Sequence, residues 1–194
     1  NQVNGVVTTF NNLKIQAEKE GYEIEFLDPS CFPYIDAPGY PEVKLSWTWG
    51  VSKEIEKHLP CYIHIATEGP LGMSARMACD RKGYIYNTSY HTKFPEYLKK
   101  MYYIPLWMSY TYLRWFHKHS GKVLTTTDTM VKELESHGFK GNIIPWTRGI
   151  DNGVFTPEIR SKEYKGYKTL LYVGRVSKEK GLDDFCSLDI TAEK

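Results

Sequence analysis

Apolar residues recur along the chain at two spacings, one typical of helices and one typical of strands. The first helical pattern runs from residue 6 to about residue 20 and ends at Gly21. Further helices are predicted at 52–58 (begun by Ser52), 73–82, 104–118 and 128–138 (capped by Asp128 or Thr129), and strands at 22–27, 44–47, 62–66, 84–88, 122–126 and 142–145. Residues 28–40 are rich in Pro and are predicted to form a loop. Alternating strands and helices predict an α/β fold, a Rossmann-like doubly wound parallel sheet with right-handed crossovers.

The pattern also predicts how the chain divides into domains. Residues 1–145 carry the strand–helix alternation and form the first domain, and residues 146–166 have little apolar periodicity and are interpreted as a linker. The apolar run at 168–173 predicts a buried strand, and Leu182 and Phe185 predict the start of a helix. Residues 167–194 are therefore interpreted as the beginning of a second domain.

The polar segment 89–97, which follows the predicted strand at 84–88, contains the first candidate for chemistry, His91. Ligands of open α/β sheets bind outside the carboxyl ends of the strands. His91 is therefore expected to face a cleft, and the alternative is a histidine in a surface loop.

Two further positions in the first domain have a functional and a structural interpretation. Gly5 precedes the first helix, where a residue without a Cβ suits a phosphate, but it also suits a plain helix start. Glu68 follows the strand at 62–66, where its carboxylate either binds sugar hydroxyls or complements the dipole of the next helix. Both alternatives remain open at each position.

Composition excludes several classes of protein. The formal net charge of +2 is too small to indicate nucleic-acid binding. The four cysteines are far apart, so we interpret them as reduced thiols of a cytosolic protein, with neither a disulfide framework nor a zinc site. No signal peptide or membrane-spanning apolar run is evident, and no metal-ligand cluster appears, so neither a metal nor another cofactor is expected.

Positive charge is concentrated in residues 93–122, which hold six Lys or Arg, one Glu and nine aromatic residues. Basic residues interleaved with Trp and Tyr suit an anionic membrane surface. The structural alternative is a core helix with solvated lysines. RNA binding is disfavoured because no nucleic-acid motif accompanies the segment.

Two cations follow the apolar run at 168–173. Arg175 comes directly after Gly174, and Lys180 precedes Gly181 five residues later. A guanidinium and an ammonium on a glycine-flanked turn can neutralise a diphosphate, although solvated cations near turns are common. The turn matches neither a Walker A loop nor a G-x-G-x-x-G motif.

Taken together, these segments resemble the retaining glycosyltransferases of family 4, which have the two-domain GT-B fold. The residues that carry the resemblance are 3–7, 64–72, 89–97, 148–151 (Arg-Gly-Ile-Asp) and 172–181. Within the family the chain looks most like bacterial α-mannosyltransferases that use GDP-mannose. Sulfoquinovosyl-, glucosyl- and galactosyl-transferases of glycolipid synthesis are the alternatives.

The resemblance implies roles for five residues. His91 matches the histidine beside the donor sugar and leaving phosphate, Gly5 matches the glycine that approaches the donor diphosphate, and Arg175 and Lys180 match the pair that holds the diphosphate. Glu68 lies where acceptor or sugar contacts are expected. The implied partners are a nucleotide-sugar donor and a lipid or glycan acceptor, at the cytoplasmic face of a membrane, without a metal.

The chain also departs from the family pattern. The strand expected before Gly5 and most of the second domain, with its E-x7-E segment, are missing, so the chain as it stands is expected to bind donor weakly and to be inactive. Two other classes remain as alternatives, a sugar-nucleotide epimerase of the same fold and a non-enzymatic membrane-surface module.

Overall fold

The structure is a computed structural model that describes residues 5–37, 40–46, 49–58, 60, 62–150, 152–159, 170–174, 176 and 181–188. It divides into two units, residues 1–149 and residues 150–194, which are described separately. The helices of the first unit are α1 (Gly5–Lys19), α2 (Val51–His58), α3 (Pro70–Lys82), α4 (Phe94–Tyr102), α5 (Leu106–His117) and α6 (Asp128–Ser136). Its strands are β1 (Tyr34–Ala37), β2 (Tyr40–Ser46), β3 (Ile63–Ile65), β4 (Tyr86–Tyr90), β5 (Val123–Thr125) and β6 (Ile143–Pro145).

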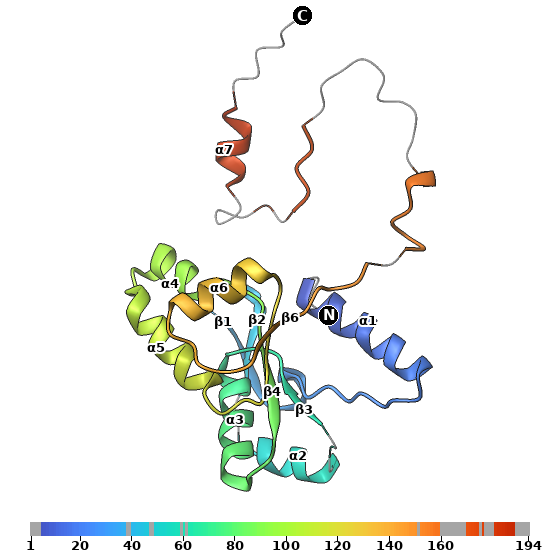
Figure 1. The fold of residues 1–194 in the computed structure, drawn as a ribbon, viewed down its shortest axis with the longest axis vertical. Helices are drawn as coiled ribbons and strands as arrows, with labels where there is room; N and C mark the ends of the chain where they lie inside the picture. Colours follow the sequence, from blue (N-terminus) through green and yellow to red (C-terminus); the bar gives the residue numbers. More distant parts are fainter. Residues whose placement is uncertain are drawn as a thin grey trace, which may run out of the picture. The chain divides into compact units, whose positions relative to one another are not determined.

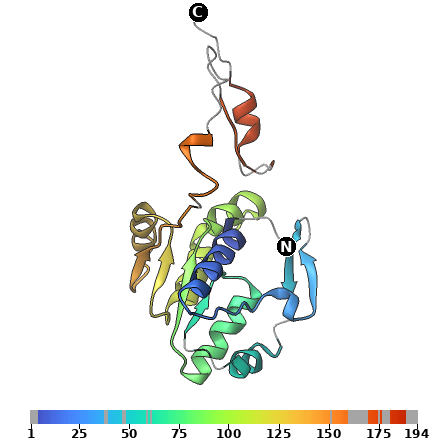
Figure 2. The ribbon, with the colours of Figure 1, turned by 90° about the vertical axis from the view of Figure 1, so that its right-hand side faces the viewer.

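A four-stranded parallel sheet in the order β3-β4-β5-β6 forms the centre of the first unit. Helices flank it: α1 crosses one face, and α3 and α5 pack on the other (Figure 1 and Figure 2). The predicted fold class, an α/β fold with a Rossmann-like parallel sheet, is confirmed. All four strands end at one edge of the sheet, so the loops that follow β3, β4 and β6 lie at that edge.

Alternation along the strands explains how the two faces differ. Ile65 is buried and packs in a core with Ala78 of α3 and Phe116 of α5. Its neighbour His64 points to the opposite face, where its ring lies 5.8 Å from the ring of Phe10 on α1. The sheet therefore separates an apolar core on the α3 and α5 side from a more polar layer under α1.

Most of the elements predicted for the first unit are present with shifted bounds, and three predictions made for this unit are wrong. The segment 22–27 has alternating apolar residues but is not a strand, because it has no neighbouring strand to pair with, and Phe26 instead packs edge-on against Phe10 at 6.4 Å. The predicted loop 28–40 contains a 3-10 turn (Pro29–Cys31) and β1, which pairs with β2 as an antiparallel hairpin. The cap of α6 is Thr127, whose hydroxyl accepts from the backbone N–H of Met130.

Helix α4 was not predicted, because its first residues belong to the segment 89–97, which was interpreted as polar, and because Lys99 and Lys100 interrupt its apolar and aromatic residues. Pro95 occupies the first turn and Glu96 lies where a carboxylate favours the helix dipole, both of which are typical of helix starts. The helix ends at Tyr103, which has a left-handed backbone with φ of 55°. The predicted helix at 52–58 is present, with Ser52 inside its first turn and bonded to Glu56.

Residues 150–194 form the second unit. A 3-10 turn (Pro157–Ile159) and α7 (Leu182–Cys186) are its described elements, and the helix start at Leu182 is confirmed. The buried strand predicted at 168–173 is wrong where it is described, since Leu171 and Val173 are exposed and lie outside any strand. Among the described residues of the whole chain, no helix has the length and apolar character needed to cross a membrane.

The loop between β3 and α3 is packed so closely that Gly72 cannot carry a side chain. A Cβ at Gly72 would lie 1.9 Å from the backbone oxygen of Thr67 and 3.2 Å from Ile65 Cγ2. We expect Gly72→Ala to lower the free energy of unfolding by about 2–4 kcal/mol, because either the loop or α3 must move. Urea denaturation measures the effect. Gly69→Ala is the control, because a Cβ there meets nothing within 4 Å, and equal stability of both variants would contradict the expectation.

Candidate active site

A group of polar and aromatic side chains gathers on the α1 face of the sheet at its carboxyl edge. His91 follows β4 directly, and Trp146 and Arg148 follow β6. Phe10 reaches the group from α1, and its ring centre lies 5.8 Å from those of both His91 and Trp146. The chain thus brings together residues from positions 10, 91, 146 and 148, which is possible only because the strands run parallel.

The centre of this group is a hydrogen bond between Arg148 and His91. Arg148 Nη2 lies 2.9 Å from His91 Nδ1. A guanidinium only donates hydrogen bonds, so Nδ1 must accept, and the proton of the neutral imidazole must be on Nε2. Arg148 therefore fixes the tautomer of His91.

Two donors in this group are left without a partner. His91 Nε2 and Arg148 Nε are both buried, and neither is hydrogen-bonded to any described residue. A buried donor without a partner costs about 1–3 kcal/mol, so two such groups at one place favour a ligand with oxygen acceptors. The cation at Arg148 further favours a negatively charged ligand.

Gly5, the first described residue of α1, borders the same group. A Cβ at Gly5 would lie 3.7 Å from Arg148 Nη1, which is ordinary contact distance. Glycine is therefore not required here by packing. Its absent side chain leaves room next to the guanidinium at the start of a helix, as a bound phosphate would need.

Burial keeps the imidazole of His91 neutral. Burial, together with the positive charge of Arg148 and the neighbouring His64, lowers the pKa of His91 to about 4. His91 is therefore a donor through Nε2 at neutral pH, with no positive charge of its own. Loss of hydration under the surrounding atoms also lowers the pKa of His64 to about 4, although part of that residue remains exposed.

His64 and Ser89 support the group from within the sheet. His64 Nε2 lies 2.6 Å from Ser89 Oγ, which joins β3 to β4 on the α1 face. The ring of His64 also stacks at a tilt against Phe10. These contacts hold Phe10, and through it His91, in place.

Glu68 lies at the same edge but has a separate set of contacts. It follows β3, and its Oε1 lies 3.6 Å from Nε2 of His117 on α5. Its backbone oxygen accepts a hydrogen bond of 2.5 Å from the hydroxyl of Tyr112, also on α5. Glu68 thus contacts the α5 side of the sheet, whereas His91 contacts the α1 side.

Of the remaining site residues predicted from the sequence, Arg175 and Lys180 lie outside the described residues. The structure brings Gly5 and His91 together through Arg148, for which no role was predicted from the sequence. The only signal for Arg148 was its place in the segment 148–151, three residues after a strand end. Phe10 and Trp146 gave no signal, because aromatic residues beside a helix or strand are usually core residues. No described residues form a group of three or more His, Cys, Asp or Glu suited to a metal ion.

Acid is expected to destabilise the first unit through these histidines. His91 is neutral in the folded chain and has an ordinary pKa near 6.5 when unfolded, so its contribution is complete above about pH 6.5 and is lost as the pH falls towards 4. After allowance for partial exposure, we expect a loss of about 1–2 kcal/mol in unfolding free energy over this range. Urea denaturation at several pH values measures it, and His91→Gln should flatten the slope.

The control for this prediction is Thr92→Ser, which changes the neighbouring exposed residue without removing a titrating group. It should keep the slope of the unmodified chain. A His91→Gln variant with an unchanged slope between pH 6.5 and 4 would show that the ring is not buried as described.

Comparisons with known proteins agree with this architecture. A family model described as Glycosyltransferase Family 4 matches residues 3–153. No curated protein and no solved structure matches the chain. Because the matched segment makes up most of the 194 residues and contains Gly5, His91 and Arg148, the protein belongs to Glycosyltransferase Family 4 and so to the glycosyltransferases.

Proposed function

We propose that this protein is a retaining hexosyltransferase that uses a nucleotide-sugar donor, with GDP-mannose favoured, and a lipid or glycan acceptor. The observation that carries the proposal is the pair of buried, unpaired donors, His91 Nε2 and Arg148 Nε, next to the side-chain-free position at Gly5. Glucose, galactose and sulfoquinovose are the alternative sugars.

The chemistry of transfer explains why such donors are useful. When the bond between the sugar carbon and the diphosphate oxygen breaks, negative charge grows on the departing diphosphate. Donors that are already fixed and dehydrated stabilise that charge better than water does, because they need no reorganisation. In the proposal Arg148 supplies the charge and the Nε–H, and the neutral His91 supplies Nε2–H to an oxygen of the donor sugar or phosphate.

The proposal also includes the domain organisation of the enzyme. Residues 1–145 would be the acceptor-side domain, residues 146–166 the connection, and residues 167–194 the start of the domain that binds the nucleotide. Arg175 and Lys180 would hold the diphosphate from that second domain. Their support is the residue chemistry of the turn, since a guanidinium and an ammonium both bind phosphate oxygens.

A turnover assay on the full-length gene product tests the proposal. The protein is incubated with GDP-mannose, UDP-glucose and UDP-galactose plus a membrane lipid extract, and released nucleotide and shifted glycolipid are measured. We expect turnover with one donor and its loss in Arg175→Ala and Lys180→Ala. Absence of turnover with every donor, from folded protein, would contradict the proposal.

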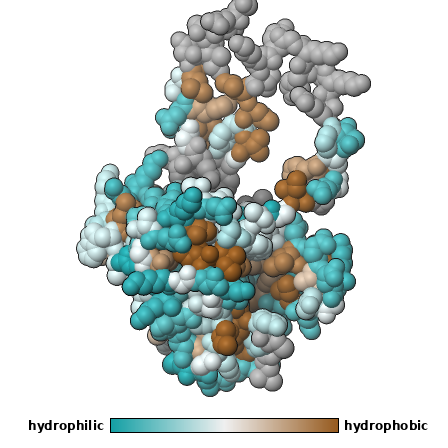
Figure 3. Space-filling model, in the orientation of Figure 1, coloured by the Kyte–Doolittle hydropathy of each residue, from teal (hydrophilic) through white to brown (hydrophobic). Residues whose placement is uncertain are grey.

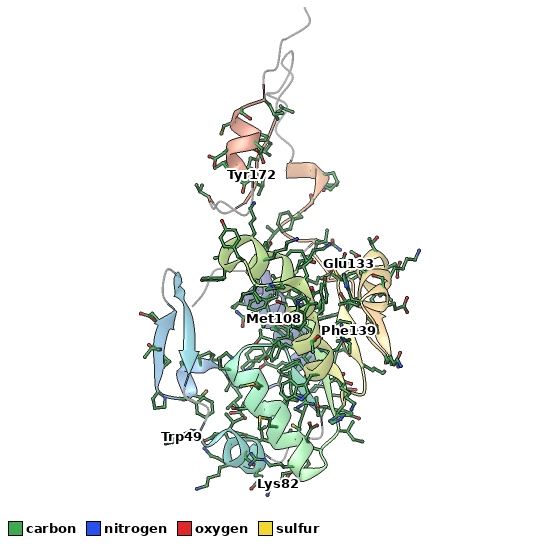
Figure 4. All side chains as sticks on the ribbon, turned by 90° about the vertical axis from the view of Figure 1, so that its left-hand side faces the viewer. Trp49, Lys82, Met108, Glu133, Phe139 and Tyr172 are labelled. Atoms are coloured by element: carbon green, nitrogen blue, oxygen red, sulfur yellow. The ribbon has the colours of Figure 1, made fainter. Side chains whose placement is uncertain are left out.

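Contact with an anionic membrane, at the cytoplasmic face, is the second part of the proposal. The corner between α4 and α5 exposes large apolar side chains: Tyr102 (56% exposed), Tyr103 (88%), Trp107 (69%) and Met108 (48%). Hydrophobic patches among hydrophilic side chains are visible on the face of the first unit in Figure 3, and Met108 lies on α5 in Figure 4. Lys99 and Lys100, in the last turn of α4, add positive charge beside them. Aromatic side chains and lysines together favour the headgroup region of an anionic bilayer.

Vesicle binding tests the membrane contact. We expect the chain to co-sediment with vesicles that contain phosphatidylglycerol at low salt. The double variant Tyr103→Ser/Trp107→Ser should reduce the bound fraction by about 10-fold, because two interfacial aromatic side chains are lost. Trp49→Ser is the matched control, since Trp49 is 85% exposed but lies beside α2, at the other end of the unit from α4 (Figure 1 and Figure 4). Equal binding of both variants would contradict the contact.

A further inference from the structure

A second polar group lies on the α5 side of the sheet and is not used by the diphosphate site. Thr88, in β4 and fully buried, has its Oγ1 2.8 Å from His117 Nδ1. His117 Nε2 in turn lies 3.6 Å from Glu68 Oε1. Thr88, His117 and Glu68 thus form a line that runs from the middle of the sheet to its carboxyl edge.

The protons along this line follow from the chemistry of its members. A carboxylate only accepts hydrogen bonds, so the favourable form of neutral His117 carries its proton on Nε2, facing Glu68. Nδ1 then accepts from the Thr88 hydroxyl. His117 Nε2 and Glu68 Oε1 are both buried and have no hydrogen-bond partner within the described part of the chain, and their 3.6 Å separation makes each a close polar neighbour of the other without a direct hydrogen bond.

The loop that carries Glu68 is held from two further directions. Tyr112 donates its hydroxyl to the backbone oxygen of Glu68 at 2.5 Å. On the other side, α3 packs so closely on Thr67 that only glycine fits at position 72. The structure therefore fixes the backbone of Glu68 and places its carboxylate beside His117, while the side chain keeps 13% of its surface exposed.

This carboxylate lies at the end of the strand next to the one that carries His91. Both residues therefore lie at the carboxyl edge of the sheet, where open α/β sheets bind their ligands, although their side chains contact opposite faces of it. A carboxylate that needed only to complement the dipole of α3 would not require a buried histidine behind it. The buried line of Thr88 and His117 indicates that the direction of the carboxylate matters.

We propose that His117 is a positioning residue that aims the carboxylate of Glu68, the acceptor contact expected from the sequence, at a hydroxyl group of the acceptor. The proposal rests on the proposed transferase function. Its substrate class is an acceptor with a free hydroxyl next to the reacting one, such as a sugar or polyol headgroup. Thr88 sets the tautomer of His117 and so contributes indirectly to the orientation of the Glu68 carboxylate.

The first test uses the full-length gene product with a donor that it turns over. Nucleotide release is compared with and without membrane lipid extract. We expect Glu68→Gln and His117→Phe to lower the release stimulated by the extract by about 10- to 100-fold, because a charge-assisted hydrogen bond is lost or misdirected. The stimulated release should fall further than the release without extract, in which water accepts the sugar. His117→Gln, which can still donate towards Glu68, should restore part of the stimulated release.

The control is Glu56→Gln, an exposed carboxylate paired with Lys82, which should change neither rate. Thermal unfolding of each variant is measured alongside. If stimulated and unstimulated release fall together, in step with the unfolding temperature, the group is structural and the proposal is overturned.

The second test does not depend on turnover. Long-range proton–nitrogen NMR of the chain reports which ring nitrogen of His117 carries the proton. We expect Nε2–H with a bare Nδ1, and a changed Nδ1 resonance in Thr88→Val. A proton on Nδ1 with a bare Nε2 facing Glu68 would overturn the positioning role. If no donor turns over, the transferase function fails while this result still decides the role of His117.

Discussion

Arg148→Ala is expected to lower the turnover of the favoured donor by about 100-fold, which corresponds to about 2.7 kcal/mol. The variant removes the one described cation that contacts His91, together with the buried Nε donor. It also releases His91 from the tautomer in which Nε2 carries the proton. Both the binding of the donor and the orientation of His91 should therefore be weakened, so the Michaelis constant for the donor should rise while kcat falls. Steady-state release of nucleotide measures both.

Two further variants sharpen this expectation. Arg148→Lys keeps the charge but loses the planar fork, so a loss of about 10-fold is expected. Arg81→Ala, an exposed arginine at the end of α3, is the control and should behave as the unmodified protein. If Arg148→Ala turns over normally, the guanidinium has no part in the reaction.

His91→Phe is expected to lower kcat by about 100-fold and to leave the Michaelis constant for the donor nearly unchanged. Phenylalanine keeps the ring packing against Phe10 and Trp146 but has no donor at the position of Nε2. A donor that acts mainly on the charge that grows in the transition state affects kcat more than ground-state binding. His91→Gln, whose amide reaches a similar position, should recover part of the rate.

The matched control for His91 is His119→Gln, because His119 is exposed and pairs with Asp80 on the other side of the sheet. It should leave turnover unchanged. A His91→Phe variant with normal kcat, or one whose loss follows its unfolding temperature, would remove His91 from the reaction.

The sequence was sufficient to predict the parallel sheet because most of its strands lie in short, mainly apolar segments between amphipathic helices. Buried strands such as β5 need apolar residues on both faces, which is a strong local signal. The segment 22–27 has the same local signal. The strand predicted there is absent because a strand also requires a neighbouring strand with which to pair. Helix α4, in contrast, is present but was not predicted, because Lys99 and Lys100 interrupt its apolar residues.

The candidate site was only partly predictable for a related reason. His91 and Gly5 stand at element ends, where position along the chain already indicates an exposed edge of the sheet. The role of Arg148 could not be predicted in this way, because it comes from a contact with His91, 57 residues away in the sequence. Which face of the sheet a residue contacts is equally hidden, so the separation of Glu68 from His91 became evident only from the packing of α1 and α5.

In the proposed function, His91 and Arg148 bind the diphosphate end of a nucleotide-sugar. A crystal structure of the full-length gene product with the donor that turns over tests it most directly. We expect donor oxygens within hydrogen-bond distance of His91 Nε2 and Arg148 Nε, with a phosphate beside Gly5. A donor bound elsewhere, with both of these atoms still unpartnered, would contradict it.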